Sequence, residues 1–263
     1  MEKRATSLTD AQAILLDLGG TLRIGGESIT GATEFLESLK KSNTPFFALT
    51  NATSKSTESL VEVLNNAGLP LQADHMITAN LVTIDYMKKK GIKSAYVIGE
   101  EEQKKEFEQH GIIVSDQKAS AVVVSFDYDL NYEKLAIADY LIRNGATYIA
   151  TNIDTHFIAE DGIGPDTGGT IGFLKATTGK DPVITGKPGQ IMMKYVMEKT
   201  GIKSTQMAMV GDALDVDMKM AHEFGMVSVM VLSGKTKRDD LACSAYQPDY
   251  VVESVENLTP LFS

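Results

Sequence analysis

The chain has 263 residues, with 25 Lys and Arg against 35 Asp and Glu, and its formal net charge is −10. This acidic balance argues against a nucleic-acid binder, which needs basic side chains to displace counterions from phosphates, and against docking on an anionic membrane surface. The single cysteine excludes an internal disulfide and a cysteine-based zinc site. No apolar run approaches the ~20 residues of a membrane span, and the polar N-terminus shows no signal peptide, so we expect a cytoplasmic protein.

Short apolar runs alternate with helical patterns along the whole chain. Strands are expected at residues 13–16, 45–49, 95–98, 121–124, 147–150, 207–210, 227–232 and 250–252. Helices are expected at 31–41, around an apolar face at 60–67, at 101–109, 132–143, 168–178 and 215–224, and at the C-terminus. Residues 162–164 and 234–236 nearly match phosphate-binding glycine motifs, but each motif lacks a required glycine, at Thr167 and Val229, so both segments are expected to be loops. The alternation predicts an α/β fold with a parallel sheet and helices on both faces.

Polar residues stand close after several expected strands: Asp17, Thr50, Asn51 and Asp212. Lys187 likewise follows a short apolar run at 183–184. Because ligands of open parallel sheets bind at the carboxyl ends of the strands, these side chains could meet at one edge of one sheet. Each also has an ordinary structural explanation, as a turn, a helix cap or a solvated surface lysine. Together they would supply a nucleophile, phosphate donors, a neutralising lysine and a metal ligand, which are the parts that phosphoryl transfer requires.

The segment 211–217 is unusually acidic. Asp212, Asp215 and Asp217 fall within six residues, and such carboxylates repel one another unless a cation or a helix N-terminus offsets their charge. One interpretation is an acidic helix-capping segment. The other is a Mg²⁺ site, because Mg²⁺ prefers hard oxygen ligands from one or two carboxylates.

In order and spacing, these motifs resemble those of the haloacid dehalogenase superfamily of phosphatases. Residues 17–21, D-L-G-G-T, match its first motif, D-x-D-G-T, with one departure. Thr50-Asn51 is similar to the second motif, Lys187 to the third, and residues 211–217 to the fourth, G-D-x-x-x-x-D. The resemblance covers nearly the whole chain.

The insert between the second and third motifs stands where this superfamily carries a type-2 cap. Residues 151–154, T-N-I-D, resemble the T-N-x-D of the NagD, or 4-nitrophenylphosphatase-like, subfamily, and 162–169 resemble the loop that opens the last cap helix. The resemblance implies a Rossmann-like parallel-sheet core at 1–78 and 183–263, and a smaller α/β cap domain at 79–182. It implies a Mg²⁺-dependent phosphatase of small phosphorylated metabolites, and leaves open whether the protein is a homo-oligomer.

The resemblance also assigns roles near the first and fourth motifs. It implies that Asp17 attacks phosphorus and forms an aspartyl-phosphate, which water then hydrolyses. Mg²⁺ would be held by Asp17, the backbone carbonyl of Gly19 and Asp212, with Asp217 acting through a water molecule.

Further roles follow for the phosphate and the rest of the substrate. The resemblance implies that Thr50, the Asn51 backbone and Lys187 hold the phosphate. The candidate substrate contacts lie in the cap, in residues 151–156, which include Thr151 and Asn152, and in residues 161–170.

The departure is Gly19, which stands where the superfamily carries the aspartate that protonates the leaving alcohol. A missing general acid-base costs ~10²–10⁴ in rate, so slow hydrolysis of sugar phosphates is expected unless another residue, with Asp154 and His156 as candidates, supplies the proton. One alternative is a substrate whose leaving group needs no proton, such as an acyl phosphate or a halide. The other is a degenerate protein that binds a phosphorylated ligand or a protein partner without turnover.

Overall fold

The computed structural model describes residues 5–159 and 162–262, which form two compact units. The first unit consists of the described residues up to Thr50, of Leu60–Ile77 and of the described residues from Met193 onward. The second consists of Asn51–Ser59 and Thr78–Met192. None of the described helices is long and apolar enough to cross a membrane.

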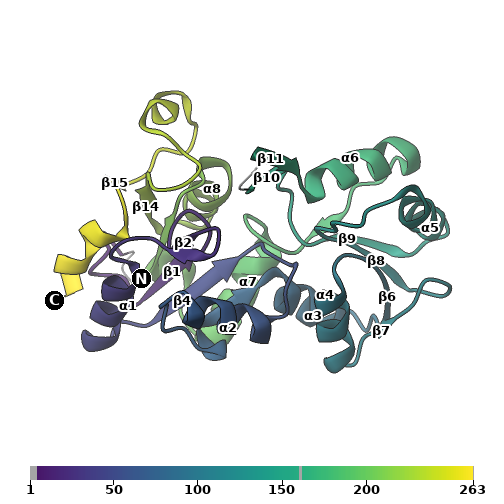
Figure 1. Ribbon diagram of the computed structural model, residues 1–263, viewed down its shortest axis with the longest axis horizontal. Helices are drawn as coiled ribbons and strands as arrows, with labels where there is room; N and C mark the ends of the chain where they lie inside the picture. Colours follow the sequence, from purple (N-terminus) through teal and green to yellow (C-terminus); the bar gives the residue numbers. More distant parts are fainter. Residues whose placement is uncertain (1–4, 160–161, 263) are drawn as a thin grey trace. The chain divides into compact units, whose positions relative to one another are not determined.

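A six-stranded sheet forms the centre of the first unit, in the order β15-β14-β13-β1-β4-β5 (Figure 1). Its strands are β1 Ala13–Asp17, β4 Phe46–Thr50, β5 Met76–Thr78, β13 Met207–Gly211, β14 Val227–Val231 and β15 Tyr250–Val252. Strand β1 pairs in parallel with β13 and β4, and the parallel pairing continues from β13 through β14 to β15. The carboxyl ends of these paired strands therefore lie along one edge of the sheet.

Both faces of β1 are buried. Ile14 and Leu16 belong to one apolar cluster, while the alternate residue Leu15 is equally inaccessible on the other side. The cluster also takes in the apolar face of α1 Ala32–Lys41, and Phe35 of that helix contacts Phe262 edge to face at a centroid distance of 6.1 Å. A strand without a polar alternation is typical of a parallel sheet covered on both sides.

Three further helices and one small strand pair belong to the segments between the strands of the first sheet. The helices are α2 Thr57–Asn66, α7 Gln190–Thr200 and α8 Lys219–Phe224. A small antiparallel pair, β2 Arg23–Ile24 and β3 Glu27–Ser28, follows β1 directly.

A second, five-stranded parallel sheet forms the centre of the second unit, in the order β12-β9-β8-β6-β7. Its strands are β6 Ser94–Ile98, β7 Ile113–Val114, β8 Ala121–Val124, β9 Thr147–Ala150 and β12 Val183–Ile184. Its helices are α3 Ala79–Lys89, α4 Glu101–Gln109, α5 Tyr132–Arg143 and α6 Thr167–Thr178. An antiparallel hairpin, β10 His156–Ala159 with β11 Gly162–Pro165, precedes α6.

Alternate residues of β6 and β8 point to opposite faces of this sheet. Val97 and Val123 join a cluster with residues of α3 and α4, whereas Ile98 and Val124 join another with residues of α5 and α6. Figure 1 shows these two helix pairs on opposite sides of the sheet. The period of two in a strand thus produces a three-layer unit with two small cores.

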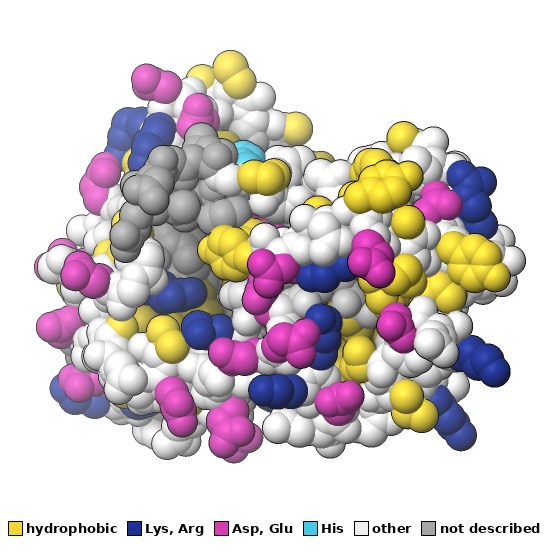
Figure 2. Space-filling view, turned by 45° about the vertical axis from the view of Figure 1, so that its right-hand side comes forward, with side chains coloured by type: hydrophobic (Ala, Val, Ile, Leu, Met, Phe, Trp, Pro, Cys, Tyr) yellow, Lys and Arg dark blue, Asp and Glu magenta, His cyan; other side chains and the backbone are white. Residues whose placement is uncertain are grey.

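Charged side chains of both signs are interspersed on the face of the molecule drawn in Figure 2. Oppositely charged side chains form pairs four residues apart on one helix, such as Lys89 with Asp85 and Arg143 with Asp139, and these pairs are largely open to solvent. Exposed pairs contribute about 0–1 kcal/mol each, so the stability of the fold rests on the apolar cores.

The predicted parallel α/β architecture with a second α/β sheet is confirmed, and the expected strands are present with small shifts at their ends. Three local predictions were wrong. Residues 215–224 are not one α-helix, because a π-helical turn, Leu214–Met218, comes before α8. The C-terminal helix, Val255–Phe262, is 3₁₀. Residues 162–165 are a strand rather than a loop, since β10 pairs with them across the chain.

Candidate active site

The central strand β1 delivers Asp17 to the edge of the first sheet. Its four apolar residues are fully buried, and Asp17 ends the strand at 7% exposure. In the parallel register Asp17 lies opposite Leu49, and Thr50 is the next residue after Leu49. Leu16 lies opposite Val210, and Asp212 follows Val210 by two residues. The sheet itself therefore brings the first, second and fourth motif positions of this unit to one edge.

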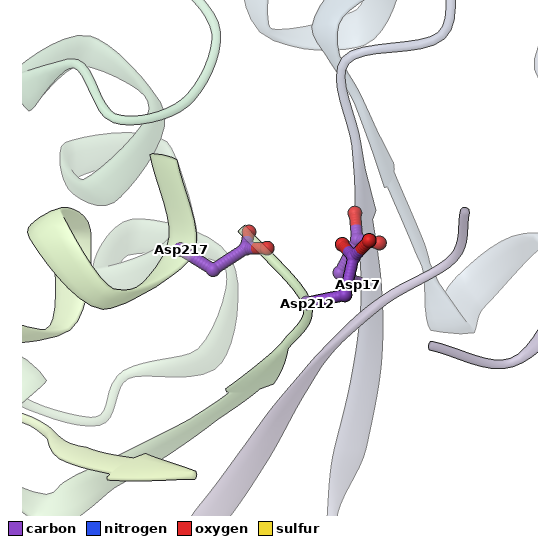
Figure 3. A group of neighbouring side chains, drawn as sticks. All are labelled: Asp17, Asp212 and Asp217. Carbon is purple, nitrogen blue, oxygen red and sulfur yellow. The ribbon is translucent and has the colours of Figure 1, made fainter. Parts of the chain in front are cut away.

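Three carboxylates converge there (Figure 3). Asp17, Asp212 and Asp217 are each buried, and each offers an oxygen within 4.8 Å of the others. Buried like charges at this separation repel strongly, and a cation among them removes the penalty. Oxygen donors of this kind suit a hard divalent cation, so the side chains present fit a bound metal ion.

Backbone contacts hold two of these carboxylates in place. The Lys235 amide donates to Asp212 Oδ2 at 2.6 Å, and the Ala213 amide donates to Asp217 Oδ2 at 3.2 Å. A Cβ at Gly20 or Gly234 would clash with the Asp212 carboxylate. Glycine is thus required at both positions for the chain to approach the acidic group this closely.

Gly19 has no such steric requirement. A Cβ added at this position meets nothing within 4 Å among the described residues, and its φ lies outside the left-handed region. An L-residue therefore fits at position 19, and the backbone does not require glycine there.

A second group of predicted site residues lies in the second unit. The Asn51 side chain joins two distant segments: its Nδ2 donates to Asp154 Oδ2 at 3.1 Å and to the Lys187 carbonyl at 3.2 Å, and its Oδ1 accepts from the Lys187 amide at 2.8 Å. Lys187 itself is 2% exposed. The alternative that this lysine is a solvated surface residue is wrong.

Thr151 and Asn152 are also buried and bonded within this unit. The Thr151 hydroxyl donates to the Val124 carbonyl at 3.4 Å, and Asn152 Nδ2 donates to the Asn51 carbonyl at 3.3 Å. These contacts give both side chains a positioning role, and their contact with substrate stays a prediction. Residue 161 of the expected substrate segment 161–170 lies outside the described residues.

The structure therefore groups the predicted residues in two sets. Asp17, Gly19, Thr50 and Asp212 lie in the first unit, joined by Asp217. Asn51, Lys187, Thr151 and Asn152 lie in the second.

Known families match most of the chain. Residues 14–113 match the haloacid dehalogenase-like hydrolases, and residues 184–258 match a HAD-hydrolase-like family. The chain is 32% identical to the 5′-nucleotidase YutF of Bacillus subtilis over 94% of its length and 96% of that protein. It is also 32% identical to an acid sugar phosphatase of Staphylococcus aureus, over 91% of this chain and 93% of that one.

Solved structures agree with these relatives. A 4-nitrophenylphosphatase from Thermotoga maritima superposes with a TM-score of 0.92 at 34% identity, covering 97% of this chain and 99% of that one. NagD from Escherichia coli K-12 superposes with a TM-score of 0.86 at 27% identity, covering 94% and 97%.

A parallel sheet that gathers buried carboxylates at its carboxyl edge, together with these matches, defines the class: the chain belongs to the haloacid dehalogenase superfamily. Phosphatases of this superfamily generally use a divalent metal ion. Within it, the chain is a phosphatase of the NagD and 4-nitrophenylphosphatase-like group, and the predicted family and enzyme class are confirmed.

Proposed function

We propose that this phosphatase is Mg²⁺-dependent and hydrolyses small phosphate monoesters through an aspartyl-phosphate on Asp17. The observation that carries the proposal is the buried group of Asp17, Asp212 and Asp217 at the carboxyl edge of the parallel sheet. A buried carboxylate beside other carboxylates becomes an effective nucleophile toward phosphorus only when its charge and that of the phosphate are offset.

Mg²⁺ bound by Asp17, the Gly19 carbonyl and Asp212 would supply that charge and act as a Lewis acid on a phosphate oxygen. Asp17 would attack with its other carboxylate oxygen. Asp217, held by the Ala213 amide, would keep the acidic group in place. Water would then attack the aspartyl-phosphate and return Asp17 to its carboxylate form.

The phosphate is proposed to bind through the Thr50 hydroxyl, the Asn51 backbone and the Lys187 ammonium. The hydrogen bonds between Asn51 and the main chain of Lys187 support this pairing of the second and third motifs. Residues 79–182 are proposed to act as the cap domain, with residues 151–156 selecting the substrate. The cytoplasmic location remains a prediction from the sequence.

Gly19 decides which monoesters are turned over well. It cannot protonate a leaving oxygen, so esters of acidic hydroxyls, such as aryl and acyl phosphates, are proposed to react faster than alkyl phosphates. The names of the relatives, a 4-nitrophenylphosphatase and an acid sugar phosphatase, include both kinds of ester. Glycine at position 19 supports a preference of this chain for the aryl kind.

The test is steady-state hydrolysis of 4-nitrophenyl phosphate with Mg²⁺ by the full chain. Asp17→Asn is expected to abolish turnover, because the amide cannot form the acyl phosphate. Asp215→Asn is the matched control: Asp215 is an exposed carboxylate paired with Lys235 at 3.5 Å, so this variant is expected to keep the wild-type rate. Turnover that survives in Asp17→Asn would remove Asp17 from the mechanism.

The same glycine favours a second candidate, a protein that binds phosphorylated ligands without turnover. Wild-type protein that binds inorganic phosphate in calorimetry, yet hydrolyses neither aryl nor acyl phosphates, would establish this candidate instead.

A further inference from the structure

Arg23 lies beside Gly19 although it belongs to none of the four motifs. It begins β2, and its main chain forms an isolated parallel bridge with Gly19. The Gly20 amide donates to the Arg23 carbonyl at 2.7 Å, which closes the turn. Since bridged strands lie ~4.8 Å apart, the long Arg23 side chain starts next to the position at which the general acid is missing.

The Arg23 guanidinium is only partly satisfied by the protein. Nη1 donates to the Gly25 carbonyl at 2.9 Å. Nε is buried and has no hydrogen-bond partner within the described part of the chain. An N–H that is withdrawn from water and left unpaired costs free energy, so this donor is suited to an acceptor that a ligand brings.

The Arg23 side chain also interacts electrostatically with the Asp17 carboxylate. Burial lowers the pKa of Arg23 below its usual value, and the attraction of the Asp17 carboxylate raises it again. An arginine side chain nevertheless stays protonated in a protein. Arg23 therefore holds a permanent positive charge within electrostatic reach of the proposed nucleophile.

An alternative is that Arg23 only offsets the charge of the acidic group. The buried Nε argues for more, because it is an N–H without a partner among the described residues, on the residue whose main chain bridges Gly19. A leaving group bound at that place carries one oxygen whose negative charge grows as the phosphorus–oxygen bond breaks.

We propose that the Arg23 guanidinium donates to the leaving-group oxygen and stabilises there the negative charge that an acid at position 19 would neutralise. This inference rests on the phosphatase function proposed above. As Asp17 forms its bond to phosphorus, the bond to the leaving oxygen breaks and its electron pair stays on that oxygen. The anion leaves hydrogen-bonded to Arg23, takes its proton afterwards from water, and the guanidinium gives up none.

This role predicts a dependence on the leaving group. A fixed charge stabilises a strongly basic leaving oxygen more than a weakly basic one, because more negative charge has developed on it in the transition state. Arg23 would thus extend the range of substrates from 4-nitrophenyl phosphate toward esters of less acidic hydroxyls.

The test compares a series of phenyl phosphates, from 4-nitrophenyl to unsubstituted phenyl, with wild type, Arg23→Met and Arg23→Lys in the presence of Mg²⁺. For Arg23→Met we expect kcat/KM for phenyl phosphate to fall by about 10², the effect of removing one preorganised donor, and at least tenfold less for 4-nitrophenyl phosphate. Arg23→Lys keeps the charge and is expected to recover part of the loss. Arg238→Met removes an exposed arginine of the same unit, paired with Glu253, and is expected to match wild type.

An equal loss for every ester, or no loss, would overturn the inference, since it would leave Arg23 a structural role only. Melting curves establish that Arg23→Met is folded, and Arg23→Lys carries the comparison if it is not. The wild-type measurement by itself tests the proposed function. If the wild-type chain hydrolyses none of these esters, both the proposed function and the role of Arg23 are wrong.

Discussion

The two parallel sheets of this chain end in different chemistry. At the carboxyl edge of the first sheet, Asp17, Asp212 and Asp217 form a buried group of like charges. At the ends of the second sheet, the buried side chains of Thr151 and Asn152 donate to main-chain carbonyls of their own unit. The like charges of the first edge favour a bound cation, whereas the polar side chains of the second are paired within the protein.

The same parallel-sheet architecture therefore carries a candidate metal site in one unit and internally bonded polar groups in the other. A parallel sheet supplies converging strand ends in both units. The side chains at those ends decide the outcome: neighbouring carboxylates favour a bound cation, while the amide and hydroxyl groups donate to main-chain carbonyls. Substitutions that add or remove one group at each edge test this contrast directly.

The largest expected effect comes from adding a carboxylate at the first edge. Gly19→Asp adds the acid that the proposed function lacks at this position, and the open space and ordinary φ there accept the side chain. We expect the hydrolysis rate of an alkyl phosphate to rise relative to that of 4-nitrophenyl phosphate by up to ~10²–10⁴. Rates with glucose 6-phosphate and 4-nitrophenyl phosphate measure it.

Gly26→Asp is the control for this substitution, since Gly26 is exposed and also accepts a Cβ without contact. A folded Gly19→Asp whose ratio of rates does not move would show that another residue supplies the proton, with Asp154 and His156 the first to examine.

Removing a carboxylate from the first edge is expected to stabilise the metal-free chain. Asp212→Asn keeps the shape of the side chain but lowers the repulsion within the acidic group, and each kcal/mol gained raises Tm by about 2–4 °C. The same change is expected to abolish the rise in Tm that Mg²⁺ produces in wild type, since a ligand that binds the native state stabilises it. Thermal melts with and without Mg²⁺ measure both, with Asp215→Asn as control.

An unchanged Mg²⁺-dependent rise in Asp212→Asn would remove Asp212 from the metal site.

Removing a polar group from the second unit is expected to lower Tm, whereas removing a carboxylate from the first edge is expected to raise it. Asn51→Ala leaves the Asp154 carboxylate and the Lys187 amide without the partner they have in Asn51, at a cost of about 1–3 kcal/mol for each group left unsatisfied. Tm should fall, with or without Mg²⁺. Asn144→Ala, at an exposed helix end of the same unit, should change Tm far less. A stable Asn51→Ala would mean that the contrast between the two edges does not hold.

Much of the fold could be predicted because its signals are local. The continuous apolar run before Asp17 indicates a doubly covered strand, and the apolar periodicity of 132–143 indicates a helix, whatever the rest of the chain does. Helices α3 and α7 are not among the predicted elements. The sequence predicts a loop at 162–165 where the structure has a strand, because the pairing of that strand with β10 depends on another segment.

The sequence by itself determined the order and spacing of the motifs, the carboxylates available to a metal, and the absence of an acid at position 19, since these depend only on which residues follow each strand. The tertiary structure alone decided that Lys187 is buried and that Asn51 bonds to it and to Asp154 across more than a hundred residues. It also decided that Arg23 lies beside Gly19, with an Nε that has no hydrogen-bond partner among the described residues. Burial and hydrogen bonding depend on what packs around a side chain, and no local pattern of residues carries that information.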